Sequence, residues 1–499
     1  MTAANLGHAA DLGHFDVVVV GAGTGGLCVA IEAADGGASV LVVDKLSDVG
    51  GMLHIANGEF SGAGTRRQAA RGIEDSPERH FDDVMRLSHG RADRDLVWQT
   101  VRAQGDTVDW LESLGFDFDP ATPGLVHGHE VYSVPRTYWG VEFGRSVLRV
   151  LRRRLDDVVA SGAVRLLLGT RISGAVVEDG RVSGVTGTDA DGREVVARGD
   201  AIVLATGGYD ANPGLRNEFL PPGCENAIIA CLDHATGDGL VLATEIGADV
   251  SRDGFFIPVM GLIPDPDRQG FAVDYREAFV EVAPAYRTPY EIWVNRDGRR
   301  FVAEDGTSPE HRERALLRQP GITMYVVWDR AIAETAEPLI RNGAGDWTRE
   351  RMLAECERGR WIVAADTLEE LAERLGVDAA GLTETVERYN AAVDAGHDPE
   401  HGRTTLPMPI GEPPYYALTS VAASLLSRDG LRVNGDLAVL DRRGAAIPGL
   451  YAVGEVLGNN VFAGDNYVGG MSVTPAMTLG RRLGARLAAE RRTTGQGIA

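Results

Sequence analysis

The chain has 499 residues, of which 44% are hydrophobic and 24% charged, as in an ordinary globular protein with room for two domains. Its formal net charge of −23 argues against nucleic acid and anionic membrane surfaces as partners. No run approaches the roughly 18 consecutive apolar residues of a membrane helix, so no transmembrane segment is expected. Residues 1–13 lack the basic start and apolar core of a secretion signal, and we expect a short disordered lead on a cytoplasmic protein.

Residues 15–45 contain the strongest local motif. A run of four valines predicts a buried strand, and Gly21, Gly23 and Gly26 follow it in Gly-x-Gly-x-x-Gly spacing. In a dinucleotide-binding turn, the first glycine permits the tight turn, the second lets a pyrophosphate approach the backbone, and the third lets helix and strand pack closely. A helix is expected next, and a second strand ends at Asp44, whose carboxylate can bind ribose hydroxyls. The motif predicts a bound dinucleotide without separating NAD from FAD.

Three later segments narrow the choice of cofactor. Residues 199–210 form another apolar strand that ends in Ala-Thr-Gly-Gly, and residues 447–456 form a short strand that ends at Gly454 and Glu455. Residues 464–484 place two glycines and a serine before an apolar run with helical spacing, which is typical of a helix N-terminus that faces a ligand. These segments resemble the flavin-binding elements of the FAD-dependent family that includes fumarate reductases, succinate dehydrogenase flavoprotein subunits and 3-ketosteroid dehydrogenases.

Smaller motifs agree with that resemblance. Residues 48–64 form a glycine-rich loop, Thr-Gly-Asp-Gly opens a helix at residues 236–239, and residues 170–185 alternate around Glu-Asp-Gly as a hairpin does. In covalent members of the family a histidine of the glycine-rich loop carries the flavin, and Met52 matches that position here, so non-covalent FAD is expected. Together the motif and the resemblance imply FAD contacts at Gly21, Gly23, Thr24, Gly25, Gly26, Asp44, Lys45, Gly51, Met52, Asn57, Gly58, Ile172, Ala205, Thr206, Gly207, Asp238, Gly454, Glu455, Ser472 and Val473.

FAD elements at both ends of the chain predict an interrupted domain. The expected fold class is α/β, with a Rossmann-like FAD-binding domain formed by residues 14–257 and 428–499. The insert, residues 258–427, is expected to be an α+β domain that caps the substrate.

No metal site is expected. The four cysteines, Cys28, Cys224, Cys231 and Cys356, never reach Cys-x-x-Cys spacing, which gives no support to zinc, iron–sulfur or haem groups. Residues 127–130 read HGHE, but no third ligand cluster accompanies them, and an exposed loop is the expected structure. Without a second redox group in the chain, the flavin needs an external electron acceptor or donor.

The catalytic positions depart from those of the fumarate reductases. In that group an acid arginine, a histidine pair and a carboxylate-binding arginine match, in order, Ser308, the pair Leu425 and Leu426, and Tyr467. A small dianion would therefore lose its charged partners here, and burial of an unpaired carboxylate is costly.

Residues 466–481, NYVGGMSVTPAMTLGR, resemble the C-terminal motif of the 3-ketosteroid dehydrogenases, with one residue fewer before the proline. The resemblance implies that the Tyr467 hydroxyl and the backbone amide of Gly470 or Met471 hold a ketone oxygen beside the flavin. Hydrogen-bond donors of this kind stabilise the negative charge that develops on the oxygen.

The group that moves the proton is left open by the sequence. The cap tyrosine of the ketosteroid dehydrogenases is missing after the Arg-Phe pair, where Glu304, Glu310 and His311 are available instead. Their flavin-domain tyrosine has two possible counterparts, Tyr132 and Tyr138.

These observations predict an FAD-dependent oxidoreductase that acts on CH–CH groups next to a carbonyl. The expected substrate is a hydrophobic cyclic or polycyclic ketone, desaturated by the enzyme or formed by the reverse ene-reduction. Two alternatives stay open: reduction of an unsaturated carboxylate, and a flavin subunit that passes electrons to a partner protein. The candidate substrate-binding cations are Arg136 and Arg287, with Arg312 as a third.

Overall fold

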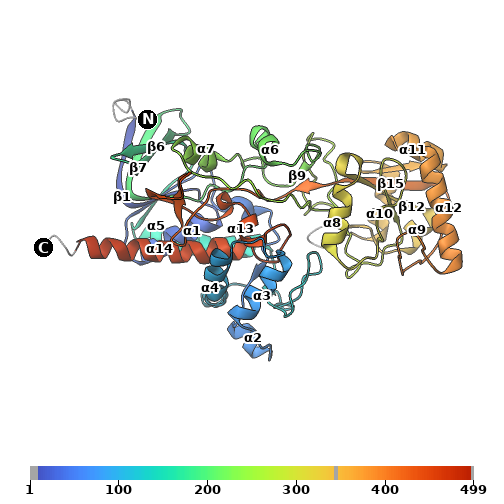
Figure 1. The fold of residues 1–499 in the computed structure, drawn as a ribbon, viewed down its shortest axis with the longest axis horizontal. Helices are drawn as coiled ribbons and strands as arrows, with labels where there is room; N and C mark the ends of the chain where they lie inside the picture. Colours follow the sequence, from blue (N-terminus) through green and yellow to red (C-terminus); the bar gives the residue numbers. More distant parts are fainter. Residues whose placement is uncertain (1–8, 342–346, 496–499) are drawn as a thin grey trace.

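The computed structural model describes residues 9–341 and 347–495, with side chains described as far as residue 491. Figure 1 shows an elongated molecule in which a large sheet with the long helix α14 (Val473–Gly495) occupies one end. A smaller sheet surrounded by helices occupies the other end. Each end has its own hydrophobic core.

The larger core is built on an eight-stranded sheet. Its strands run in the order β17-β18-β8-β1-β2-β5, and β6 and β7 join it through β8. The central strands are parallel and apolar because helices cover both faces, and Val17 to Val20 are at most 6% exposed. The strands are β1 (Ala10–Val20), β2 (Val40–Val43), β5 (Val164–Leu167), β6 (Arg171–Glu178), β7 (Arg181–Thr188), β8 (Glu194–Leu204), β17 (Ala438–Leu440) and β18 (Ala446–Ala452).

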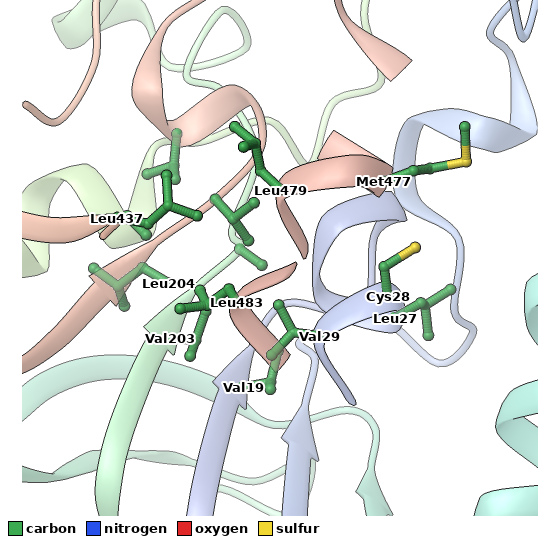
Figure 2. Packing of buried hydrophobic residues seen from close by; sticks show 14 of the residues in the cluster. Val19, Leu27, Cys28, Val29, Val203, Leu204, Leu437, Met477, Leu479 and Leu483 are labelled. Atoms are coloured by element: carbon green, nitrogen blue, oxygen red, sulfur yellow. The ribbon is translucent and has the colours of Figure 1, made fainter. Parts of the chain in front are cut away.

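Helix α14 brings the C-terminal motif to the glycine motif. It packs on α1 (Thr24–Asp35), and Figure 2 shows its Leu479 and Leu483 among Val29 of α1 and the strand residues beneath. The two helices approach closely because both carry glycines at the contact: a Cβ at Gly480 would lie only 2.6 Å from the carbonyl oxygen of Gly25. Glycines separated by more than 450 positions therefore form one seam.

A helical layer lies between β2 and β5 in the sequence. In Figure 1 its helices α2, α3 and α4 project away from the large sheet. Its short β3–β4 ladder is tied to α14, since the Ser61 amide donates to Thr474 Oγ1 at 2.7 Å. The elements are η2 (Gly51–His54), β3 (Phe60–Ser61), α2 (Arg66–Ala70), α3 (Pro77–Leu87), α4 (Arg94–Ser113), β4 (Thr137–Tyr138) and α5 (Gly144–Ala160).

The second core is built on a four-stranded antiparallel sheet, ordered β11-β12-β15-β14. Its buried residues run from Cys224 to Ala422, inside the interruption of the larger sheet. Its strands and helices are β11 (Ile292–Val294), α8 (Pro309–Leu317), β12 (Thr323–Asp329), α9 (Arg330–Thr335), α10 (Arg349–Arg358), β14 (Ile362–Ala365), α11 (Leu368–Leu375), α12 (Ala379–Ala395) and β15 (Tyr415–Val421).

The remaining elements are short. They include two small ladders, β9 with β16 and β10 with β13. Their bounds are α6 (Pro213–Phe219), β9 (Ile228–Ile229), α7 (Asp238–Glu245), β10 (Phe279–Val280), η3 (Pro320–Ile322), β13 (Ile340–Arg341), β16 (Ala423–Ser424), η4 (Glu455–Leu457) and α13 (Asn460–Ala463).

The N-terminal prediction needs a correction. A disordered lead was expected over residues 1–13, but β1 begins at Ala10, because Ala10 and Asp11 pair in parallel with Val195 and Val196 of β8. Residues 1–8 lie outside the described part of the chain. The predicted hairpin is confirmed as β6 and β7, which meet at Asp179 and Gly180 with positive φ angles of 47° and 76°. No helix in the described ranges combines the length and apolarity that a membrane crossing requires.

Candidate functional site

The Gly-x-Gly-x-x-Gly turn lies between β1 and α1, and its three glycines meet different surroundings. Gly21 has φ +107°, and a side chain there would overlap the carbonyl of Ala205. A Cβ at Gly26 would overlap the carbonyl oxygen of Gly21. At Gly23, in contrast, a Cβ meets no protein atom within 4 Å, and Gly51 is its nearest neighbour across the opening. Gly21 and Gly26 allow close packing of the backbone, whereas Gly23 leaves room for a phosphate at the N-terminus of α1.

Asp44 holds this turn from the end of β2. Its Oδ2 accepts a hydrogen bond from the Ala22 amide at 2.7 Å, and its Oδ1 accepts from the Leu46 amide at 2.8 Å. Each carboxylate oxygen has a second lone pair, which is free to accept a ribose hydroxyl.

Lys45 and Asp238 lie side by side at the same edge of the sheet. Lys45 Nζ donates to Thr236 Oγ1 at 2.6 Å and to Asp238 Oδ2 at 2.8 Å, while Arg171 Nη2 reaches Asp238 Oδ1 at 2.5 Å. These cations hold the pKa of Asp238 below its usual value, although burial opposes them. Lys45 and Asp238, both predicted FAD contacts, therefore bind other side chains of the protein, and these bonds fix the start of α7.

The remaining predicted FAD contacts are spread over loops, helix starts and one strand. Thr206 Oγ1 is buried without a hydrogen-bond partner in the described ranges, and space is open beside Gly207, whose φ is +75°. Gly58 packs on the start of α5, and His54 turns its Nε2 toward the carbonyl of Val49 at 3.0 Å. The others are Thr24 and Gly25 in α1, Gly51 and Met52 in η2, Ile172 in β6, Val473 at the start of α14, and Asn57, Ala205, Gly454 and Ser472 in loops.

Glu455 begins η4 and belongs to a buried chain of polar groups. Its Oε1 accepts from the Ser427 amide at 3.0 Å, and Ser427 Oγ in turn donates to Asp210 Oδ2. Burial and the charge of Asp210 raise the pKa of Glu455 to about 7. Two acids without a cation at ion-pair distance are costly unless a proton or a ligand hydroxyl joins them. The unpaired Thr206, the opening at Gly23 and this acid pair all fit a dinucleotide with a polyhydroxyl chain.

Tyr467 lies in the loop before α14 and is buried, at 7% exposure. Its ring packs against the His129 ring, with 5.4 Å between centroids, and the Arg428 guanidinium lies 5.9 Å from the ring centroid. Burial raises the pKa of Tyr467, so the phenol keeps its proton and acts as a hydrogen-bond donor at neutral pH. No hydrogen bond of the hydroxyl is found among the described residues.

Arg428 fixes the loop that carries Tyr467. Its guanidinium donates to the carbonyls of Phe255 at 3.0 Å, Asn466 at 3.2 Å and Gly464, and to Asn459 Oδ1 at 3.1 Å. No sequence pattern singles out Arg428, because its partners are mostly backbone carbonyls from distant segments.

The backbone amides of Gly470 and Met471 differ in whether they are available as hydrogen-bond donors to a ketone oxygen. The Met471 amide donates to the Val468 carbonyl at 3.0 Å, whereas no partner of the Gly470 amide is found in the described part. A Cβ at Gly470 would lie 2.5 Å from the Ser61 amide, and its φ is +73°, so glycine is required there. Tyr132 supports this turn, since its hydroxyl donates to the Gly469 carbonyl at 2.6 Å.

Tyr138 lies apart from Tyr467, in the packing of β4. Its hydroxyl shares a 2.5 Å hydrogen bond with Thr65 Oγ1, and its ring stacks on Phe60 with 5.7 Å between centroids. Burial raises the pKa of Tyr138. This placement disfavours a catalytic role for Tyr138 and gives its hydroxyl a structural partner.

The two arginines expected to bind substrate are bonded to other groups of the protein. Arg136 is fully buried and forms ion pairs of 2.8 Å with both Asp75 and Asp83. Arg287 is 5% exposed and binds Glu291 at 2.9 Å and the carbonyl of Glu337 at 3.0 Å. All three nitrogens of the Arg136 guanidinium, and Nε and Nη1 of Arg287, are bonded within the protein, which speaks against the sequence-based assignment.

Replacement of Arg136 by methionine is expected to destabilise the protein by about 3–5 kcal/mol, because Asp75 remains buried without a cation and Asp83 keeps only the exposed Arg86. Urea unfolding measures this loss. The rate of flavin reduction per folded molecule is expected to stay unchanged. A variant with normal stability but a raised KM for a carboxylate would restore Arg136 as a substrate ligand.

The residues that the sequence offered for proton transfer lie in different surroundings. Glu304 is fully buried in the second core, where it binds Arg300 and Arg403, and His311 is exposed. Glu310 accepts from Asn466 Nδ2 at 3.0 Å and so supports the loop before Tyr467. Glu313 of α8 was not singled out by the sequence, yet its charge raises the pKa of Tyr467, which places it near the phenol.

Glu313 provides a pH test. Burial raises its pKa from 4.5 to about 8, so the folded chain keeps a proton that the unfolded chain releases. Stability is therefore lost as the pH rises from about 4.5 to about 8, by about 1.4 kcal/mol for each unit of pKa difference. Replacement of Glu313 by glutamine is expected to flatten the dependence of melting temperature on pH across this window. Replacement of the exposed Glu387 on α12 by glutamine is the control. A Glu313→Gln variant whose melting temperature depends on pH as that of wild type does would contradict the raised pKa of Glu313.

Comparisons with known proteins agree with this geometry. The family model described as FAD binding domain matches residues 16–473. The fumarate reductase (cytochrome) of Shewanella frigidimarina is 31% identical over 475 residues, which are 95% of this chain and 77% of that protein. The 4-oxocyclohexanecarboxylate 2-dehydrogenase of Sinomonas cyclohexanicum is 28% identical and covers 95% of this chain and 93% of its own length.

The crystal structure of the 3-ketosteroid Δ1-dehydrogenase from Sterolibacterium denitrificans superposes with a TM-score of 0.79. The match covers 96% of this chain and 100% of that chain at 22% identity, which shows a shared fold alone. The predicted α/β class with a Rossmann-like FAD-binding body is confirmed. The chain belongs to the FAD binding domain family, and it is an FAD-dependent oxidoreductase of that family.

Proposed function

We propose that the protein dehydrogenates a cyclic or polycyclic ketone at the CH–CH bond next to its carbonyl, or reduces the corresponding enone. One observation carries the proposal: the buried, protonated Tyr467 and the Gly470 amide, which has no hydrogen-bond partner in the described ranges, belong to the same loop before the N-terminus of α14. Two donors of this kind fit a single carbonyl oxygen.

The residues have distinct tasks in this reaction. Bound FAD supplies the exchange of a hydride with the carbon two bonds from the carbonyl. The Tyr467 hydroxyl and the Gly470 amide hold the carbonyl oxygen and stabilise its developing negative charge. Tyr132 and Arg428 keep the two donors in place through the carbonyls of Gly469 and Gly464. The division into an FAD-binding domain of residues 14–257 and 428–499 and a cap of residues 258–427 stays part of this proposal.

A second candidate is reduction of an unsaturated carboxylate. It is favoured by Arg312, which is 2% exposed, donates to the Gly306 carbonyl and has a buried Nε without a partner in the described ranges. The 31% identity to a fumarate reductase points the same way. Against it, burial lowers the pKa of Arg312 and so disfavours its charged form, while the charges of Glu313, Glu130 and Glu281 oppose that shift only in part.

FAD is proposed to be bound without a covalent link, because His54 faces the Val49 carbonyl and Met52 offers no nucleophile. The substrate is proposed to be a hydrophobic small molecule, with an external electron carrier. Transfer of electrons to a partner protein and location in the cytoplasm stay predictions of the sequence.

Anaerobic mixing of the FAD-loaded protein with separate probes tests the proposal. A saturated steroid ketone or cyclohexanone is expected to bleach the visible absorption of the flavin, whereas fumarate is expected to leave dithionite-reduced flavin unchanged. Reoxidation by fumarate together with no response to any ketone would favour the carboxylate candidate.

A further inference from the structure

The HGHE loop, residues 127–130, bridges the two bodies of the molecule. Its first residue, His127, donates its amide to the Tyr286 hydroxyl at 2.9 Å, and the two rings pack edge to face at 6.1 Å. Its last residue, Glu130, accepts a hydrogen bond from Ser308 at the start of α8. Both partners belong to the predicted cap, so contacts on either side of His129 fix the loop there.

His129 faces the opposite way, toward the flavin-binding body. Its ring lies 5.4 Å from the Tyr467 ring, with an angle of 33° between the planes. Its Nδ1 is buried, and neither ring nitrogen forms a hydrogen bond within the described ranges. A buried polar atom without a partner is costly, and such atoms are rare unless a ligand or water pairs with them. The imidazole therefore offers unused hydrogen-bonding capacity beside the phenol that holds the carbonyl.

The charges around His129 come from several elements. The half-buried Glu59, which precedes β3, feels the charge of His129, while burial raises the pKa of Glu59. The Arg428 guanidinium lies 5.9 Å from the Tyr467 ring centroid, and the charge of Glu313 on α8 adds to burial in raising the pKa of Tyr467.

We propose that His129 is the catalytic residue that moves the proton at the carbon next to the substrate carbonyl. This inference rests on the proposed ketone chemistry. In dehydrogenation, an imidazole nitrogen takes the proton from that carbon, and the C–H electron pair becomes the new C=C bond. The hydrogen of the following carbon leaves with its electron pair, as a hydride, to the bound FAD. The imidazolium then releases its proton to water, and enone reduction runs through the same transfers in reverse.

Exchange of carbon-bound hydrogen tests the proton step apart from the hydride step. Cyclohexanone and a saturated steroid ketone are incubated in deuterated buffer with protein whose flavin is kept reduced by dithionite, so that no hydride can be accepted. Wild type is expected to introduce deuterium next to the carbonyl, detected by mass spectrometry. His129→Gln is expected to lose this exchange by about 10²-fold or more, and flavin reduction by the same ketones with it.

The matched control is His127→Gln, which removes the neighbouring imidazole but is expected to keep both rates. FAD content and melting temperature show whether each variant folds, and His129→Asn is the substitute if the glutamine variant does not. Exchange by His129→Gln at the wild-type rate would overturn the role of His129 even if Tyr467→Phe abolishes turnover. If wild type neither exchanges nor bleaches with any ketone, the proposed function fails and this inference fails with it.

Discussion

Replacement of Tyr467 by phenylalanine is expected to slow reduction of the flavin by a ketone by about 10²–10³-fold while FAD stays bound. The change removes one donor to the carbonyl oxygen and leaves the ring, which packs on His129 and faces Arg428. The lost hydroxyl has no protein partner in the described part, so the fold loses no hydrogen bond with it. Anaerobic stopped-flow measurement of flavin bleaching gives the rate constant directly.

Tyr138→Phe is the matched control for that experiment. It also removes a buried phenol hydroxyl, but one that is bonded to Thr65 and lies in the aromatic packing around Phe60. It is expected to cost about 1 kcal/mol of stability and little rate. If Tyr138→Phe stops the reaction and Tyr467→Phe does not, the donor to the carbonyl oxygen has been assigned to the wrong tyrosine.

Replacement of Gly23 by valine is expected to yield a folded protein that no longer holds FAD. Gly23 has φ −80° and ψ −171°, angles that valine adopts readily, and a Cβ there meets no protein atom within 4 Å. The added side chain occupies only the space that a pyrophosphate needs in order to approach the turn. The ratio of flavin absorbance to protein absorbance after purification, together with circular dichroism, measures both outcomes.

Two further variants bracket the Gly23 result. Gly411→Val also adds a side chain in open space, in the second body, and is expected to keep FAD. Gly26→Val is expected to fail to fold, because its Cβ overlaps the Gly21 carbonyl oxygen. A flavin-loaded Gly23→Val protein would show that the phosphates bind elsewhere.

The positions in the fold that the sequence predicted well depend on local chain geometry. A strand, a glycine turn and an acid at the next strand end are all within residues 15–45, so Gly23 and Asp44 could be placed from spacing alone. Arg136 and Arg287 were misjudged because an arginine's partner is often distant in sequence. Asp75 and Asp83 take up one of these cations, 61 and 53 positions away.

His129, Glu313 and Arg428 were missed for a related reason. Each acquires its surroundings only when segments distant in the sequence meet, as when Ser308 binds Glu130 next to His129. The sequence showed HGHE as two histidines beside an acid, a pattern that does not reveal which ring faces Tyr467. Burial identifies Glu313 and Arg428, and a buried ring nitrogen without a partner in the described ranges identifies His129.

The glycine seam between α1 and α14 has a consequence for biosynthesis. Gly25 and Val29 approach Gly480 and Gly484, so the nucleotide turn gains its final neighbours only after residue 484 has left the ribosome. Until then the face of α1 that packs on α14 has no cover, and contacts between such distant residues form slowly. Completion of the nucleotide turn is accordingly a late event in folding.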